Sequence, residues 1–133
     1  MFVVKRSGAK WRPVIDLRVL NKLIAPDAYP LPRQDKIVAA LKGKYWLSIF
    51  DIRSAYYQRH VHPDDWWKLA VPTHHGHEAF TVAPMGLSIS IPHQQRYMDK
   101  LLRRLHWKVA LCFIDDVIIF STTFEDHLRD LFS

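Results

Sequence analysis

An α+β fold, with an antiparallel sheet backed by helices, is predicted by the order of hydrophobic patterns along this 133-residue sequence. Three observations support this prediction. Hairpin patterns, each made of two short apolar runs, lie at residues 2–16 and 111–121. A further apolar strand pattern lies at residues 47–52. Amphipathic helical patterns lie between these strand patterns and after the last one.

The composition indicates one folded domain with a basic surface. Hydrophobic residues make up 49% of the chain, which is enough for a substantial core. Lys and Arg number 19 against 13 Asp and Glu, so the formal charge is +6 and polyanionic partners are favoured. The one cysteine, Cys112, excludes a disulfide framework and favours a reducing, intracellular setting. No apolar run approaches the about 20 residues of a membrane-spanning helix, and no signal-peptide pattern opens the chain.

The first hairpin pattern has a cationic turn that contains glycine. The basic residues around Trp11 are Lys5, Arg6, Lys10 and Arg12. Arginine pairs with phosphate through two hydrogen bonds and lysine acts as a point charge, so this turn is predicted to hold a triphosphate or a nucleic-acid backbone. A plain solvated turn is the alternative interpretation.

Proline and glycine set the boundaries of the next elements. Three prolines predict that residues 18–32 are irregular. A short amphipathic helix is predicted over residues 32–42, with Gly43 as its stop. Residues 68–80 are predicted to form two short strands joined at His74–His77. Three histidines in four residues could bind zinc, but a glycine-centred turn explains them better.

Two helices are predicted on either side of the second hairpin. The first covers residues 91–106. It carries an apolar stripe, which we expect to pack in the core, at Tyr97, Leu101 and Leu105 with Met98 and Leu102 beside them. The second opens at residues 122–125, where Thr-Thr-Phe-Glu resembles a capping box.

Two adjacent carboxylates, Asp115 and Asp116, interrupt the apolar run at residues 111–121 and are expected at the tip of its hairpin. Two charges about 4 Å apart in a partly desolvated site repel by roughly 4 kcal/mol at an effective dielectric of about 20. A divalent cation that prefers hard oxygen ligands, Mg²⁺ or Mn²⁺, compensates such repulsion. A solvated Asp-Asp turn is the alternative.

A third carboxylate, Asp51, lies near the end of the strand pattern at residues 47–52. If that strand lies beside the second hairpin, three carboxylates converge. Two-metal phosphoryl transfer needs such a cluster, because it uses two cations roughly 3.5 to 4 Å apart. Catalysis of this kind depends on positioning, so a bare acidic cluster on rigid strands is sufficient.

Short sequence blocks occur in a characteristic order along the chain. They are Lys10-Trp11-Arg12, Asp16-Leu17-Arg18, Leu20-Asn21-Lys22, Tyr29-Pro30-Leu31-Pro32, Asp51 through Gln58, Val61-His62-Pro63, Gly76-His77, Met85-Gly86-Leu87, Gln95-Arg96 and Phe113-Ile114-Asp115-Asp116. Together they resemble the fingers and palm of a reverse transcriptase, most closely the kind carried by gypsy-type long-terminal-repeat retrotransposons. The resemblance covers essentially the whole chain.

The resemblance implies a palm-type antiparallel sheet backed by helices, with part of a fingers subdomain and without the thumb. The expected fingers-like residues are 1–45 and 62–86, and the expected palm-like residues are 46–61 and 87–133. The chain is therefore interpreted as a partial reverse transcriptase domain.

The resemblance also implies which residues form the site. The expected catalytic residues are Asp51, Asp115 and Asp116, and the expected metal-binding set is Asp51, Ile52, Asp115 and Asp116. The expected substrate-binding residues are Lys5, Arg12, Tyr56, Met85, Gly86 and Phe113. Among these, Lys5 and Arg12 match residues that grip the triphosphate, and Tyr56 matches the ring beneath the 2′ position of the sugar. Phe113 stands where the family usually has Tyr.

The implied activity is two-metal nucleotidyl transfer from a deoxynucleoside triphosphate to a primer 3′-hydroxyl on an RNA or DNA template. Two Mg²⁺ ions, or Mn²⁺, are the implied cofactors. The expected partners are a template-primer, the dNTP and the rest of a retroelement polyprotein with thumb, ribonuclease H and integrase, and no membrane. The cytoplasm or a virus-like particle is the expected location.

Two alternatives stay open. One is a catalytically inactive retroelement fragment that retains only nucleic-acid binding. The other is a two-metal nuclease or nucleotidyl cyclase on a similar palm, which the cationic hairpin and Tyr56 disfavour.

Overall fold

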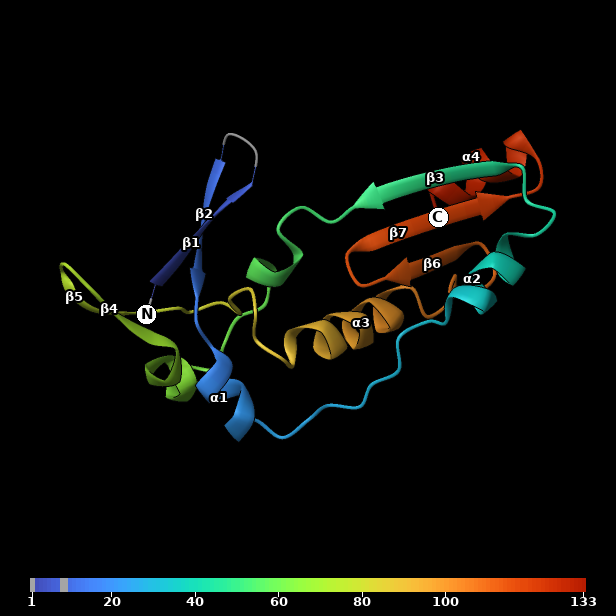
Figure 1. Cartoon of the computed structure of the whole chain (residues 1–133). Helices are drawn as coiled ribbons and strands as arrows, with labels where there is room; N and C mark the ends of the chain where they lie inside the picture. The colour runs from blue at the N-terminus through green and yellow to red at the C-terminus, as the bar shows by residue number, and fades with distance from the viewer. Residues whose placement is uncertain (1, 8–9) are drawn as a thin grey trace. The chain divides into compact units, whose positions relative to one another are not determined.

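The computed structural model describes residues 2–7 and 10–133, with side chains from residue 14 onward. The chain divides into two compact units. The first unit comprises Met1–Asp27 and Ser54–Ser90, and the second comprises Ala28–Arg53 and Ile91–Ser133. Antiparallel strand pairs and helices occur in both units (Figure 1), which confirms the predicted α+β class.

A three-stranded antiparallel sheet forms the centre of the second unit. Its strands are β3 (Trp46–Asp51), β6 (Ala110–Phe113) and β7 (Asp116–Ser121), and β7 lies between the other two (Figure 1). These segments are rich in β-branched and aromatic residues, which favour pleated strands. The prediction that the strand ending at Asp51 lies beside the second hairpin is therefore confirmed.

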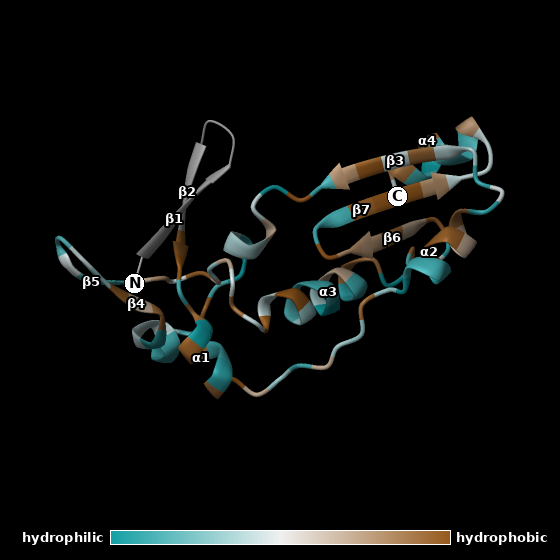
Figure 2. Ribbon diagram, in the orientation of Figure 1, coloured by the Kyte–Doolittle hydropathy of each residue, from teal (hydrophilic) through white to brown (hydrophobic). Residues whose placement is uncertain are grey.

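The sheet is most deeply buried at β6 and at the far end of β7. Leu111 and Phe120 are each 1% exposed, whereas Ile49 on the edge strand β3 is 68% exposed. In Figure 2 these strands are mostly in the hydrophobic colours, and the colour turns hydrophilic where β3 ends and β7 begins. The polar end of the sheet is therefore the end that carries the predicted carboxylates.

Helix α4 (Phe124–Leu131) follows the sheet and confirms the last predicted helix. The Thr123 hydroxyl accepts a hydrogen bond from the backbone N–H of Asp126 at 3.2 Å, which is an ordinary N-cap. The capping residue is thus the second threonine of the predicted box.

A buried polar chain ties α4 to the sheet. The Ser121 hydroxyl donates to Asp130 at 2.7 Å, so it accepts from Nδ1 of His127 at 3.2 Å. In neutral His127 the other nitrogen, Nε2, then accepts from the Ser48 hydroxyl on β3 at 2.8 Å. Since Ser48 faces α4, the alternation of side chains along β3 places Asp51 on the opposite face of the sheet.

Helix α2 (Gln34–Leu41) confirms the helix predicted over residues 32–42. It begins after Arg33 as N-cap, and Gly43 beyond its end has a φ of +76°. A positive φ favours glycine, which explains the stop at this position.

Helix α3 (Ser90–Leu101) is shorter than the predicted helix over residues 91–106. After Leu101 the backbone tightens, because Leu105 N–H bonds to Leu102 O at 2.7 Å, and Trp107 follows with a φ of +63°. The predicted stripe is confirmed only in part: Met98 is 7% exposed, whereas Tyr97 is 41% and Leu101 61% exposed. The buried residues of α3 are Ser90, Gln94, Gln95 and Met98.

The first unit opens with the predicted hairpin, β1 (Phe2–Ser7) and β2 (Lys10–Ile15). The second predicted strand pair is also confirmed, as β4 (Ala70–Thr73) and β5 (Gly76–Ala79). Two short 3₁₀ helices precede that pair, η1 (Ala55–Gln58) and η2 (Pro63–Leu69). One cluster of buried core residues in this unit comprises Ile15, Leu17, Leu69 and Val71.

Residues 18–32 are not wholly irregular, because α1 (Arg18–Leu23) forms at their start. The three prolines that discourage a helix begin only at Pro26, so one short helix fits before them. Arg18 pairs with Asp16 through two side-chain hydrogen bonds, of 2.9 and 2.6 Å, which fixes the entry into α1.

The helices in the described part of the chain include none with the length and apolar character of a membrane span.

Candidate functional site

The predicted carboxylates gather at one end of the β3-β7-β6 sheet. Asp51 is the register partner of Asp116 across β3 and β7, and Phe113 is the partner of the same Asp116 across β6 and β7. Directly opposed residues of antiparallel strands have their Cβ atoms about 4.5 to 5.5 Å apart on one face. Asp51, Asp116 and Phe113 therefore form one row on the face away from α4.

Asp115 lies in the turn beside this row. The backbone N–H of Ile52 donates to the carbonyl oxygen of Asp115 at 2.9 Å, so the chain just after β3 is tied to the turn. Asp115 is partly buried, whereas Asp51 and Asp116 are exposed. The tertiary structure thus brings together Asp51, Ile52, Phe113, Asp115 and Asp116 within the second unit.

The sequence predicted that Asp115 and Asp116 form the tip of the hairpin. The turn residues are instead Ile114 and Asp115, because Asp116 is already the first residue of β7. Ile114 has a φ of +62°, a left-handed conformation that is rare for a β-branched residue. In two-residue hairpin loops such a position is usually glycine or asparagine. The left-handed conformation costs roughly 1 to 2 kcal/mol, so the surroundings of Ile114 must hold it in place.

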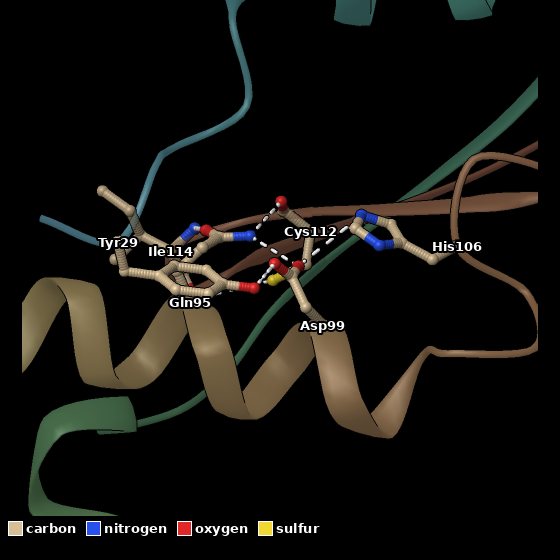
Figure 3. A network of polar contacts seen from close by, with 6 residues as sticks. All are labelled: Tyr29, Gln95, Asp99, His106, Cys112 and Ile114. Atoms are coloured by element: carbon tan, nitrogen blue, oxygen red, sulfur yellow. Dashed lines mark hydrogen bonds and ion pairs between the residues drawn. The ribbon is translucent and has the colours of Figure 1, made fainter.

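Gln95 of α3 holds it by hydrogen bonds to the backbone (Figure 3), and the Gln95 side chain is fully buried. Its Oε1 accepts from the Ile114 N–H at 2.8 Å, and its Nε2 donates to the Cys112 carbonyl at 2.9 Å. A single planar carboxamide therefore bonds to the backbone on both sides of Phe113. We call this arrangement the Gln95 clamp.

A second layer of contacts holds the Gln95 clamp itself (Figure 3). Nε2 of Gln95 also donates to Oδ1 of Asp99 at 2.9 Å, and the Tyr29 hydroxyl donates to Oδ2 of Asp99 at 2.6 Å. This hydrogen bond to a carboxylate raises the pKa of Tyr29, because it stabilises the protonated phenol. Nε2 of His106 lies 3.6 Å from Oδ1 of Asp99. The Arg96 guanidinium lies 4.7 Å from the centre of the Tyr29 ring.

Burial also acts on the thiol of Cys112, which is 1% exposed. Removal from water raises its pKa to about 12, and the nearby charges of Asp99, Asp115 and Asp116 act in the same direction. A thiol with this pKa is a weak nucleophile, so Cys112 serves as a small apolar core residue.

The carboxylates fit a divalent metal in donor chemistry, because Asp oxygens are the hard ligands that Mg²⁺ and Mn²⁺ prefer. Within residues 2–7 and 10–133, no group of three His, Cys, Asp or Glu side chains lies in an arrangement that would hold an ion. Metal binding by Asp51, Asp115 and Asp116 stays a prediction.

The remaining predicted residues lie in the first unit. Lys5 and Arg12 are register partners in the β1-β2 hairpin, and their side chains lie outside the described part of the structure. Tyr56 is partly buried in η1. Met85 and Gly86 form a turn in which Gly86 has a φ of +93°, a value that favours glycine.

The sequence pattern includes Gln95 in one of the family blocks but predicts no role for it. It also does not predict that Asp99 and Tyr29 support Gln95. Spacing contained a signal: Gln95 and Met98 are three residues apart and share one face of α3. A glutamine on the same helical face as an apolar residue is a candidate for burial, and buried amides need hydrogen-bond partners.

Comparison with known proteins agrees with this geometry. The sequence profile of the family described as "Reverse transcriptase (RNA-dependent DNA polymerase)" matches residues 3–132. The chain is 36% identical over 126 residues to the Retrovirus-related Pol polyprotein from transposon 297 of Drosophila melanogaster, covering 94% of this chain and 12% of that protein. It is 32% identical over 129 residues to the Transposon Tf2-7 polyprotein of Schizosaccharomyces pombe, covering 97% of this chain and 10% of that protein.

Solved structures show the same fold. The foamy viral protease-reverse transcriptase dRH in complex with double-stranded DNA superposes with a TM-score of 0.84 at 23% identity, covering 98% of this chain and 22% of that one. The enzyme in complex with an RNA/DNA hybrid gives a TM-score of 0.81 at 21% identity, covering 93% and 17%. The palm and fingers architecture is therefore the fold of this chain.

The curated relatives are much longer than this chain, which spans about a tenth of their length. Both are transposon polyproteins by name, and the family profile matches residues 3–132 of this chain. The chain belongs to the reverse transcriptase (RNA-dependent DNA polymerase) family.

Proposed function

We propose that this segment carries the nucleotidyl-transfer site of an RNA-directed DNA polymerase from a gypsy-type long-terminal-repeat retrotransposon. One observation carries the proposal: antiparallel register sets Asp51 opposite Asp116, with Asp115 in the adjoining turn. A primer 3′-hydroxyl attacks the α-phosphate of a deoxynucleoside triphosphate at this cluster, and pyrophosphate leaves.

The residues that hold the metals are Asp51, Asp115 and Asp116, with the backbone of Ile52 beside them. When bound, two Mg²⁺ or Mn²⁺ ions stabilise negative charge on the attacking and leaving oxygens. The protein's own contribution is positional, because the paired strands and the Gln95 clamp fix where the carboxylates lie.

Six residues are proposed to bind the substrate. Lys5 and Arg12 neutralise the triphosphate as a point charge and a planar two-bond donor. Tyr56 excludes a 2′-hydroxyl sterically, and the turn at Met85–Gly86 lies beside the nucleotide and template. Phe113 is the register partner of Asp116, and we propose that its side chain contacts the nucleotide at this end of the sheet.

The wider setting follows from the same proposal. The polymerase works as part of a polyprotein that supplies thumb, ribonuclease H and integrase, and its template-primer is RNA or DNA. Its location is intracellular, in the cytoplasm or a virus-like particle.

Primer extension on an RNA template tests the activity in the longer polymerase that contains this segment. Asp115→Asn with Asp116→Asn is expected to lower the rate by about a thousandfold or more, because charge stabilisation by bound metal contributes several kcal/mol. Asp35→Asn, which alters an exposed carboxylate on α2, is the matched control and keeps full activity. Extension that survives the double substitution contradicts the mechanism.

Manganese binding tests the site in the 133-residue chain. Paramagnetic Mn²⁺ is expected to broaden the amide signals of Ile52 and of residues 114–117 first, because those amides flank the carboxylates. The same titration of the Asp51→Asn variant should need more metal for equal broadening. Broadening that is uniform along the chain, or unchanged by Asp51→Asn, contradicts a site at this cluster.

Nucleic-acid binding without chemistry is the second candidate, and the formal charge of +6 favours it. It predicts affinity that falls steeply with salt and does not depend on divalent metal. Metal-dependent primer extension by the longer enzyme would exclude this candidate.

A further inference from the structure

The side chain of Asn21 bridges two backbone groups that are far away in sequence. Its Nδ2 donates to the Gly86 carbonyl at 2.8 Å, and its Oδ1 accepts from the Ser88 N–H at 2.9 Å. The bonded residues are 65 and 67 positions from Asn21. One carboxamide thus bonds to the chain on both sides of Leu87, and we call this the Asn21 clamp.

This pattern has a physical meaning. In a parallel strand pair, one residue bonds through its own N–H and C=O to the carbonyl before and the N–H after its neighbour. The carboxamide of Asn21 presents a donor and an acceptor in the same way. It therefore acts like a short piece of strand that bonds to the chain where it leaves the turn at Gly86.

Both sides of the Asn21 clamp rest on the core of the first unit. Leu17, whose carbonyl accepts the Asn21 N–H at 2.8 Å, is 6% exposed and belongs to the core cluster. Leu20, one residue before Asn21, and Leu87, between the two bonded groups, both pack against that cluster. The clamp is therefore preorganised, because packing sets the distance between α1 and the turn before the hydrogen bonds form.

The turn itself is open on its other side. A Cβ atom built on Gly86 would meet no heavy atom within 4 Å, and Gly86 and Ser88 are exposed. Asn21 thus fixes the backbone of the turn without covering Gly86, which leaves the glycine accessible to a ligand.

We propose that Asn21 is a positioning residue that sets the Met85–Gly86 turn for the incoming nucleotide. This inference rests on the proposed function, in which that turn lies beside the nucleotide and template. The proposal gives Asn21 no part in the chemical step. Its loss releases the Gly86 carbonyl and the Ser88 N–H to water, so the turn samples more conformations and binds nucleotide less tightly.

Kinetics of the longer polymerase test the positioning role. Asn21→Leu is expected to raise KM for the dNTP about fivefold, equivalent to about 1 kcal/mol, while kcat changes less than about twofold. Val19→Ala, on an exposed position of the same helix, is the matched control and leaves both constants unchanged. An unchanged KM in Asn21→Leu overturns the inference.

Amide exchange in the 133-residue chain tests the clamp independently of activity. Asn21→Leu should lower the protection factor of the Ser88 amide. Asn21→Asp should lower it less, because a carboxylate still accepts from the Ser88 N–H but cannot donate to the Gly86 carbonyl. If the protection factor of the Ser88 amide is the same in the Asn21 variants and the parent, the clamp is overturned. If the longer enzyme extends no primer, the proposed function is contradicted, and the exchange measurement still tests the clamp.

Discussion

Two carboxamide clamps, one in each unit, hold two turns by the same bonding pattern. Gln95 bonds to the carbonyl before Phe113 and the N–H after it, at 2.9 and 2.8 Å. Asn21 does the same around Leu87, at 2.8 and 2.9 Å. In each case a turn with a positive φ lies next to the bracketed residue.

The two clamps differ in burial and in what they restrain. Gln95 is 0% exposed and has a third bond to Asp99, and it holds an isoleucine in a conformation that isoleucine resists. Asn21 is only partly buried and holds a glycine, for which φ of +93° carries little cost. The comparison teaches that a turn with a strained residue needs a buried side chain with all its hydrogen bonds made. A turn with glycine at the positive φ can be held by a partly exposed side chain.

The largest effect is expected at the buried clamp. Gln95→Met keeps the approximate volume but leaves the Ile114 N–H, the Cys112 carbonyl and Asp99 without this partner. At about 1 to 3 kcal/mol for each unsatisfied buried group, the free energy of unfolding should fall by roughly 3 kcal/mol or more. Urea denaturation measures it, and Asn21→Leu, expected to cost about 1 kcal/mol, is the comparison. Equal losses in both variants would remove the distinction between the clamps.

The reactivity of Cys112 reports whether the buried clamp is closed. A pKa near 12 instead of the ordinary 9.0 lowers its thiolate fraction about a thousandfold at neutral pH. Iodoacetamide should therefore label the native chain at least about a hundredfold more slowly than the urea-unfolded chain. Gln95→Met should accelerate native labelling and Asn21→Leu should not. Fast labelling of the unmodified chain would show that the hairpin is not closed in solution.

The turn residues sharpen the comparison further. Gly86→Ala should cost about 1 to 2 kcal/mol through backbone conformation alone, because an added Cβ meets no neighbour. A chain assembled with D-alanine at position 86 should show almost no loss, since positive φ suits a D-residue. Ile114→Gly should change stability by less than about 1 kcal/mol, because relief of strain offsets lost burial. Thermal unfolding measures the stability of each variant. Equal losses of stability for L-alanine and D-alanine at position 86 would argue against a conformational cause.

A small effect is also expected at the support of the Gln95 clamp. Tyr29→Phe removes the 2.6 Å hydrogen bond to Asp99 and should cost about 1 kcal/mol. Because the pKa of Tyr29 is raised in the folded chain, its stabilisation is present below the ordinary value of 10.0 and is lost as pH rises through the folded value. Unfolding measured from neutral to alkaline pH should therefore show the variant and the parent converging. A difference that grows with pH would contradict this assignment.

Several features of the fold were predictable because they depend on neighbours in sequence. Runs of apolar, β-branched and aromatic residues predicted β6 and β7, Gly43 predicted the end of α2, and the threonines before Phe124 predicted the start of α4. The end of α3 was not predictable in this way. Residues 102–106 continue the apolar spacing, yet the backbone tightens there and Leu101 stays exposed.

The sequence by itself determined the candidate carboxylates and the family, because residue type and order along the chain are enough to recognise both. Only the tertiary structure decided that Asp51 faces Asp116, that the hairpin turns at Ile114, and that Gln95 and Asn21 clamp distant backbone. The physical reason is range. Hydrophobic period and capping act over a few residues, whereas strand register and side-chain bonds across 65 positions depend on how the chain packs.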